Sequence, residues 1–176
     1  MGAISTRICG KSPIRVNLIG DSGVGKTRIL YAYMLGDDEC FDTNHTSWYN
    51  IEVVPYRNCY FKIVDFGGCD KLQPTFRERF KGVPILIFVI DSSDRESVRS
   101  SKDILDAWIS TNGVENVILL IFANKQDLSN AMTVPEIVDQ YKLKELKCRW
   151  HVQPCVGLRA EGISDGFDWI CKNFSQ

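Results

Sequence analysis

Apolar runs of strand length alternate with stretches of helical periodicity along this chain. Strands are expected at 14–19, 51–56, 60–64, 84–91, 117–123 and 150–154, and helices at 29–35, around 98–109, at 134–141 and at 163–174. The runs at 84–91 and 117–123 are apolar throughout, which is typical of central parallel strands covered on both faces. This alternation predicts a doubly wound α/β fold, whose ligands bind at the carboxyl ends of the strands.

Two of these strands are separated only by Arg57-Asn58-Cys59, which predicts a β-hairpin with Asn58 in its turn. The acidic stretch 36–46 before the hairpin has no period and is expected to be a loop. The stretch 69–82 after it is charged and irregular. Within that stretch Phe76 and Phe80 stand at helical spacing, either as partner contacts or as buried anchors.

Length and composition limit the function classes. With 176 residues, 44% of them hydrophobic and 24% charged, the chain is expected to form one domain over 14–176, preceded by a short segment at 1–13. A net charge of -1 gives no general attraction for nucleic acid. No apolar run is long enough to span a membrane and the N-terminus lacks a secretory signal, so the body is expected to be soluble.

The seven cysteines contain no C-x-x-C pair. Their scattered positions argue against a zinc site and against a disulfide framework. Several lie in apolar runs, where we expect reduced core residues of an intracellular protein.

The segment between the first strand and the first helix matches the phosphate-binding pattern G-x-x-x-x-G-K-[ST]. It reads Gly20-Asp21-Ser22-Gly23-Val24-Gly25-Lys26-Thr27. Backbone N–H groups of such a loop turn inward, and the helix N-terminus adds unpaired N–H groups and a positive dipole end. Lys26 is expected to reach the β- and γ-phosphates, and the Thr27 hydroxyl to face Mg²⁺. The alternative is a glycine-rich turn that matches the pattern by chance. The residues at the ends of the other strands distinguish between these two interpretations.

Asp65-Phe66-Gly67-Gly68 follows the second strand of the hairpin. In a protein with a phosphate-binding loop, the Asp65 carboxylate is expected behind the coordination shell of Mg²⁺. Gly68 would let a backbone N–H group approach the terminal phosphate. Thr46, just ahead of the hairpin, could bring a hydroxyl to the metal, or could simply begin the strand.

Asn124-Lys125-Gln126-Asp127 follows the run at 117–123 and predicts guanine recognition. The Asp127 carboxylate can accept hydrogen bonds from N1–H and N2–H₂ of guanine, a pair of donors that adenine lacks. The stem of Lys125 is expected on the purine ring, and Asn124 to tie this loop to the phosphate loop. A polar turn that starts a helix is the alternative. Farther along, Val156-Gly157-Leu158 is expected to point a backbone N–H group at guanine O6.

The first residues, Met1-Gly2-Ala3-Ile4-Ser5-Thr6, match the acceptor pattern for myristate on Gly2. The pattern is short, and an unmodified N-terminus is the alternative. One myristoyl chain binds membranes only marginally, so a second signal is needed. The candidates for that signal are Ile4, Arg7, Ile8, Cys9, Lys11 and Arg15.

Over essentially its whole length the sequence resembles small GTPases of the ADP-ribosylation factor (Arf) and Arf-like family. The most similar stretches are Asp65-Phe66-Gly67-Gly68-Cys69-Asp70-Lys71-Leu72, close to the family's DVGGQDK segment, and Phe122-Ala123-Asn124-Lys125-Gln126-Asp127-Leu128. The resemblance implies a G domain with a mostly parallel six-stranded sheet and one antiparallel edge hairpin. It also implies a GTP/GDP switch with Mg²⁺, acylation of Gly2, and a cytoplasmic protein that associates reversibly with the Golgi or another endomembrane.

The same resemblance implies that Thr46 is the switch I threonine and, with Thr27, a ligand of Mg²⁺. The catalytic group would then be Lys26, Thr46, Gly68 and residue 69. Partners would be an exchange factor, an activating protein and effectors in intracellular traffic. The sequence departs from the family in the phosphate-loop interior, in Trp48 of a longer switch I, and in the 156–158 loop.

The most consequential departure is Cys69, which stands where the family has its catalytic glutamine. A thiol is a weak donor and acceptor and is too short to orient a water molecule against the γ-phosphate. Two functions remain open: a slow membrane-cycling GTPase, or a GTP-loaded binding scaffold that has lost hydrolysis. An ATPase or nucleotide kinase is disfavoured by Asn124 and Asp127.

Overall fold

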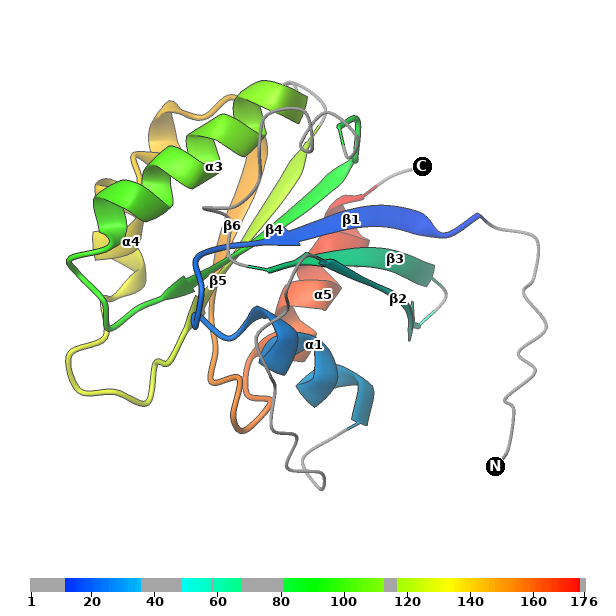
Figure 1. Cartoon of the computed structure of the whole chain (residues 1–176), viewed down its shortest axis with the longest axis horizontal. Coiled ribbons are helices and arrows are strands. Elements are labelled where there is room, and N and C mark those ends of the chain that lie inside the picture. The colour runs from blue at the N-terminus through cyan, green and yellow to red at the C-terminus, as the bar shows by residue number, and fades with distance from the viewer. Residues whose placement is uncertain (1–11, 36–48, 58, 68–80, 113–116, 175–176) are drawn as a thin grey trace.

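The computed structural model of the chain describes residues 12–35, 49–57, 59–67, 81–112 and 117–174. Its centre is a six-stranded sheet with the strand order β2-β3-β1-β4-β5-β6 (Figure 1). The strands are β1 (Ile14–Ile19), β2 (Tyr49–Tyr56), β3 (Cys59–Phe66), β4 (Ile85–Asp91), β5 (Ile118–Asn124) and β6 (Arg149–Pro154). Only β2 and β3 pair antiparallel, so the predicted doubly wound sheet with one antiparallel edge hairpin is confirmed.

Helices cover both faces of the sheet (Figure 1). On one face lie α3 (Val98–Asn112) and α4 (Val134–Gln140), and on the other α1 (Lys26–Leu35) and α5 (Ile163–Asn173). A short 3₁₀ helix (Leu143–Glu145) precedes β6. No helix in the described ranges is long and apolar enough to cross a membrane.

The central strands are apolar throughout because successive side chains enter opposite cores. In β4, Phe88 and Ile90 pack under α3, whereas Ile87 and Val89 pack under α1 and α5. Burying both faces of these strands removes apolar area from water, which stabilises the fold by about 25 cal/mol per Å². Trp108 of α3 is fully buried in the first of these cores.

Several predicted boundaries differ from the structure by one to three residues; β2, for example, begins at Tyr49 rather than Ile51. The hairpin turn does not include Cys59, which pairs with Tyr56 as the first residue of β3, and β3 continues through Asp65 to Phe66. Arg57 holds a left-handed φ of 50° in that turn, and Asn58 lies outside the described residues. The first helix begins at Lys26 rather than Ile29 because its first turn belongs to the phosphate loop and has no apolar period.

Helix starts follow capping chemistry that the sequence carries. Thr133 and Glu136 form a reciprocal capping box at the start of α4. Before α3, the Asp94 carboxylate accepts from the backbone N–H groups of Glu96 and Ser97 at 3.2 and 3.1 Å. These caps fix the connections after β4 and β5, whose carboxyl ends carry the candidate site.

Candidate nucleotide-binding site

The predicted site residues that the structure describes gather at one edge of the sheet, where the parallel strands end. Leu18 of β1 is in register with Asp65 of β3, and Asp91 of β4 with Asn124 of β5. The phosphate loop therefore follows β1 next to Asp65, and the loop after β5 begins next to Asp91. This is the edge at which doubly wound folds bind their ligands.

The phosphate loop is folded tightly against the sheet. Gly20 has a φ of 147°, and a Cβ atom at this position would lie 2.2 Å from the carbonyl oxygen of Val89, so only glycine fits. Lys26 is 6% exposed, and its ammonium group donates to the carbonyl oxygens of Gly20 and Asp21 at 2.9 and 2.6 Å. The lysine is thus held over the loop by the loop's own backbone, at the point where phosphate oxygens would compete for the same donor.

Thr27 and Asp65 form the candidate magnesium position. The Thr27 hydroxyl donates to Asp65 Oδ2 at 2.6 Å. Asp65 is fully buried; its Oδ1 atom has no hydrogen-bond partner among the residues that the structure describes. Burial raises the pKa of this carboxyl, against the hydrogen bond from Thr27 and the charge of Lys26.

These two side chains fit a Mg²⁺ ion. A hydroxyl that donates its proton to a carboxylate can ligate only through its lone pairs, and a buried carboxylate oxygen without a partner is best satisfied by a cation or its water. Magnesium uses few protein oxygens and completes its shell with water and phosphate. Accordingly, no cluster of three metal-binding His, Cys, Asp or Glu residues occurs in the described part of the chain.

Asn124, the last residue of β5, connects the phosphate loop to the loop that follows β6. Its Nδ2 donates to the carbonyl oxygen of Val24 in the phosphate loop at 2.8 Å, and its Oδ1 accepts from the backbone N–H of Gly157 at 2.8 Å. Gly25 makes room for this amide, because a Cβ atom there would lie 2.5 Å from Nδ2. The predicted tie between Asn124 and the phosphate loop is therefore present in the structure.

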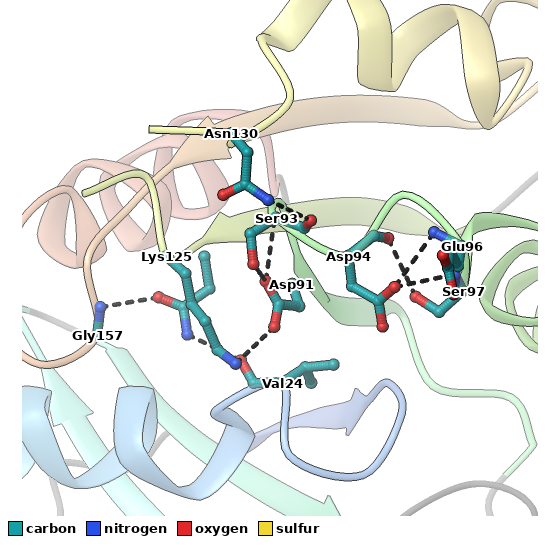
Figure 2. A network of polar contacts seen from close by, with 10 residues as sticks. Val24, Asp91, Ser93, Asp94, Glu96, Ser97, Lys125, Asn130 and Gly157 are labelled. Carbon is teal, nitrogen blue, oxygen red and sulfur yellow. Dashed lines mark hydrogen bonds and ion pairs between the residues drawn. The ribbon is translucent and has the colours of Figure 1, made fainter. Parts of the chain in front are cut away.

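Lys125 stands beside Asn124 with a left-handed φ of 64°. Its ammonium group makes an ion pair with Asp91 Oδ2 at 2.5 Å, and Asp91 Oδ1 accepts from the backbone N–H and the hydroxyl of Ser93 at 2.9 and 2.7 Å (Figure 2). Burial raises the pKa of the Asp91 carboxyl, but the hydrogen bonds from Lys125 and Ser93 outweigh it and leave the pKa lowered. Lys125 is thus anchored to the end of the neighbouring strand.

Asp127 lies within 3.8 Å of Arg159, measured between Oδ2 and Nη1. Arg159 also donates through Nε and Nη2 to the carboxylate of Glu161, at 2.6 and 3.3 Å. Glu161 closes the same loop, because its carbonyl oxygen accepts from the backbone N–H of Val156 at 3.1 Å. The 156–161 loop therefore places the positive charge of Arg159 next to Asp127, the carboxylate that is expected to bind guanine.

Asp91 and Arg159 were missed by the sequence analysis. Asp91 ends an apolar strand in the same way as Asp65, so its position was a usable signal. Arg159 had no such signal, because its partner lies on a different strand end. Four of the predicted site residues, Gly2, Thr46, Gly68 and Cys69, lie outside the described ranges, and so do Trp48, Phe76 and Phe80. The roles predicted for them therefore stay predictions.

The structure places the remaining predicted residues together at this edge, on strand ends, on the loops that follow them and in the first turn of α1. They are Gly20 to Thr27, Asp65, Asn124, Lys125, Asp127, Val156 and Gly157. The Gly157 N–H, predicted to meet guanine O6, donates here to Asn124, and that of Val156 donates to Glu161. Their contact with guanine stays a prediction.

Comparisons with known proteins agree with this geometry. The profile of the ADP-ribosylation factor family matches residues 2–174. Among solved structures, the chain is similar to the Arl6 BBS3 small GTPase from Trypanosoma brucei with the bound nucleotide analogue GppNp. The two share 25% sequence identity and a TM-score of 0.76, over 92% of this chain and 96% of the other.

Proposed function

Because this chain belongs to the ADP-ribosylation factor family, whose members are GTP-binding switches, we propose that it cycles slowly between GTP and GDP and recruits effectors to membranes when GTP is bound. The family and the similar GTPase structure make it a guanine-nucleotide-binding protein of the GTP hydrolase class. Slow hydrolysis, the recruitment of effectors and the association with membranes are what we propose in addition.

The observation that carries the proposal is the position of Asn124 between the two recognition loops. Its amide connects Val24 of the phosphate loop with Gly157 at 2.8 Å on either side, and Asp127 follows three residues later. A phosphate bound over Lys26 and a guanine bound to Asp127 would thereby be held at a fixed separation. Because the two loops are already ordered before the nucleotide binds, little entropy is lost in ordering them on binding. This favours a nucleotide whose base and phosphates match that separation.

Thr27 is proposed to ligate Mg²⁺, together with Thr46, with Asp65 accepting the proton of the Thr27 hydroxyl. The ion, when bound, would neutralise charge on the β- and γ-phosphates. Lys26 would bind the same phosphates from the loop side. The fit of Thr27 and Asp65 to a hard cation supports this assignment.

A competition experiment tests the nucleotide assignment. Fluorescent GDP bound to the full chain should be displaced by GTP and GDP at much lower concentrations than by ATP, because adenine leaves the Asp127 carboxylate without donors. An unsatisfied carboxylate costs at least about 1 to 3 kcal/mol, which is about tenfold or more in affinity. Chelation of Mg²⁺ should weaken GTP binding. Equal displacement by ATP and GTP would reject the proposal.

Cys69 favours a second function, a GTP-loaded scaffold with little or no hydrolysis. The thiol replaces the amide that orients the attacking water in the family pattern, whereas the residues proposed to bind the nucleotide are retained. Binding would then be normal while the switch rests mostly in its GTP form. Hydrolysis measured over a single turnover distinguishes the two functions.

Membrane association is proposed to depend on myristate at Gly2. The N-terminal pattern and the family match from residue 2 support it. A single acyl chain binds reversibly, which suits a cytoplasmic protein that visits the Golgi or another endomembrane.

A further inference from the structure

Cys59 and Cys171 lie together at the end of the β2–β3 hairpin that is remote from the nucleotide site. Cys59 pairs with Tyr56 in the hairpin, and the Tyr56 hydroxyl donates to Asp168 of α5. Cys171 follows Asp168 by three residues and therefore lies on the same face of the helix. Both thiols pack against the core between α5 and the sheet, and after burial it is the neighbouring Cys59 that raises the pKa of Cys171 most, so the two lie near each other.

The pair differs from the other described cysteines in its access to solvent. Cys59 and Cys171 are half-buried, whereas Cys148 and Cys155 are buried in the two cores. A small reagent can therefore reach the first two. All four are present as free thiols.

We propose that Cys59 and Cys171 are an oxidation site for a small disulfide of the glutathione type, which converts them into an intramolecular disulfide joining the β2–β3 hairpin to α5. The hydrogen bond from Tyr56 to Asp168 holds the hairpin against α5 beside both thiols, and a disulfide requires their Cβ atoms to approach to about 3.5–4.5 Å. The site is independent of nucleotide chemistry.

The reaction proceeds by two thiol–disulfide exchanges. The Cys59 thiolate attacks the glutathione disulfide, forms a mixed disulfide and releases one glutathione thiolate. The Cys171 thiolate then attacks Cys59 Sγ, forms the protein disulfide and releases the second. The protein loses two protons and two electrons, and glutathione disulfide is reduced to two molecules of glutathione.

Deprotonation of Cys171 controls the second exchange. Burial, the neighbouring Cys59 and the charge of Asp168 raise the pKa of Cys171 to about 11, against the charge of Arg57. The second exchange, in which the Cys171 thiolate attacks, should therefore accelerate as the pH rises. The side chain of Arg57 is 65% exposed and forms an ion pair with Asp168, so these two charges beside the thiols largely offset each other.

The experiment uses the reduced full-length protein treated with glutathione disulfide, quenched with an alkylating reagent and digested without reductant. Mass spectrometry should find a peptide linking Cys59 to Cys171, while Cys148 and Cys155 remain unmodified until the protein is denatured. Cys171→Ser should trap glutathione on Cys59, and Cys59→Ser should abolish both products. Cys148→Ser serves as the matched control and should leave the linked peptide unchanged.

Thermal denaturation gives a second readout that needs no variant. A disulfide closing a loop of about 100 residues should raise the Tm by about 10 °C, and dithiothreitol should reverse the rise. Affinity for GDP should not change in either serine variant, because Cys59 lies about 20 Å along β3 from Asp65. Absence of the linked peptide in the folded protein, or oxidation of Cys148 or Cys155 at the same rate, overturns the proposal.

Discussion

Lys125 and Asp91 form an ion pair at 2.5 Å between the ends of two neighbouring strands, β5 and β4. The pair fixes the ammonium end of the lysine whose stem is expected to cover the guanine ring. Ser93 holds the Asp91 carboxylate from its other oxygen, so the lysine is bound to a rigid partner. The left-handed backbone at Lys125 costs free energy, which the ion pair with Asp91 helps to offset.

Replacing Asp91 by Asn should weaken GDP and GTP binding about tenfold, because Lys125 loses the charge that orients it. Isothermal titration of nucleotide into the variant measures the loss. Asp94→Asn is the matched control, since Asp94 caps α3 on the same connection and does not contact Lys125. Equal losses in both variants would assign the effect to the connection as a whole.

The same pair predicts an acid dependence of stability. The Asp91 pKa is lowered in the folded protein, so the stabilisation is present above the carboxyl's ordinary value of 3.8 and is lost as the pH falls through the lower folded value. Asp91→Asn should therefore be less stable than the native protein at pH 7, and the difference should shrink as the pH falls below 3.8. Urea denaturation at several pH values checks this; a constant difference would contradict it.

Gly25→Ala should disrupt nucleotide binding far more than Gly23→Ala. Both glycines have positive φ, at 96° and 77°, so both substitutions introduce backbone strain. Only at Gly25 would the new Cβ meet Asn124, whereas nothing lies within 4 Å at Gly23. The displaced amide should cost about 1 to 3 kcal/mol more, which is at least about fivefold in GDP affinity. Similar affinities in the two variants would contradict the role given to Asn124.

Asp127→Asn should exchange guanine specificity for xanthine. Xanthine presents a carbonyl where guanine has its exocyclic amine, and the Asn amide can donate to it. Competition between GDP and xanthosine diphosphate should shift by about tenfold or more towards xanthine. A variant that loses both nucleotides equally would indicate that Asp127 only stabilises its loop.

Cys69→Gln should raise the single-turnover rate of GTP hydrolysis by about tenfold or more, equivalent to roughly 1.4 kcal/mol of barrier. The restored amide can orient the attacking water, while affinity for GTP should stay the same. A rate unchanged from the native protein, with both fully loaded, would mean that phosphate, Mg²⁺ and a partner's arginine perform the chemistry.

Gly2→Ala should make the protein cytosolic in a eukaryotic cell, because the remaining N-terminal residues are too few and too polar to anchor it. Mass spectrometry of the native N-terminus should find myristate on Gly2. An unmodified glycine in protein from such a cell would contradict membrane attachment by this route.

The fold was predictable because local patterns determined it. Apolar runs marked the strands, and the phosphate loop marked the start of α1. The errors occurred where local pattern and pairing differ: Cys59 joined β3 through its partner Tyr56, and Lys26 began a helix without apolar spacing. Neither the pairing of Cys59 with Tyr56 nor the role of Lys26 in the phosphate loop produces a periodic pattern of apolar residues in the sequence.

The site was predictable only as far as single motifs reach. Asn124, Lys125 and Asp127 were recognised from their spacing, but Asp91 and Arg159 act through ion pairs to residues more than thirty positions away. Such contacts depend on which strands become neighbours and on the geometry of the loops that follow them. Their residue types alone are ordinary surface charges.

One amide, that of Asn124, carries the mechanical connection between the phosphate loop and the 155–157 loop. Pulling either loop outward breaks a hydrogen bond to the same side chain and so loosens the other. A partner protein that promotes nucleotide release would therefore not have to displace both the guanine-binding loop and the phosphate loop. Displacement of one loop would weaken the hydrogen bond that Asn124 makes to the other, so this one side chain would couple release of the base to release of the phosphates.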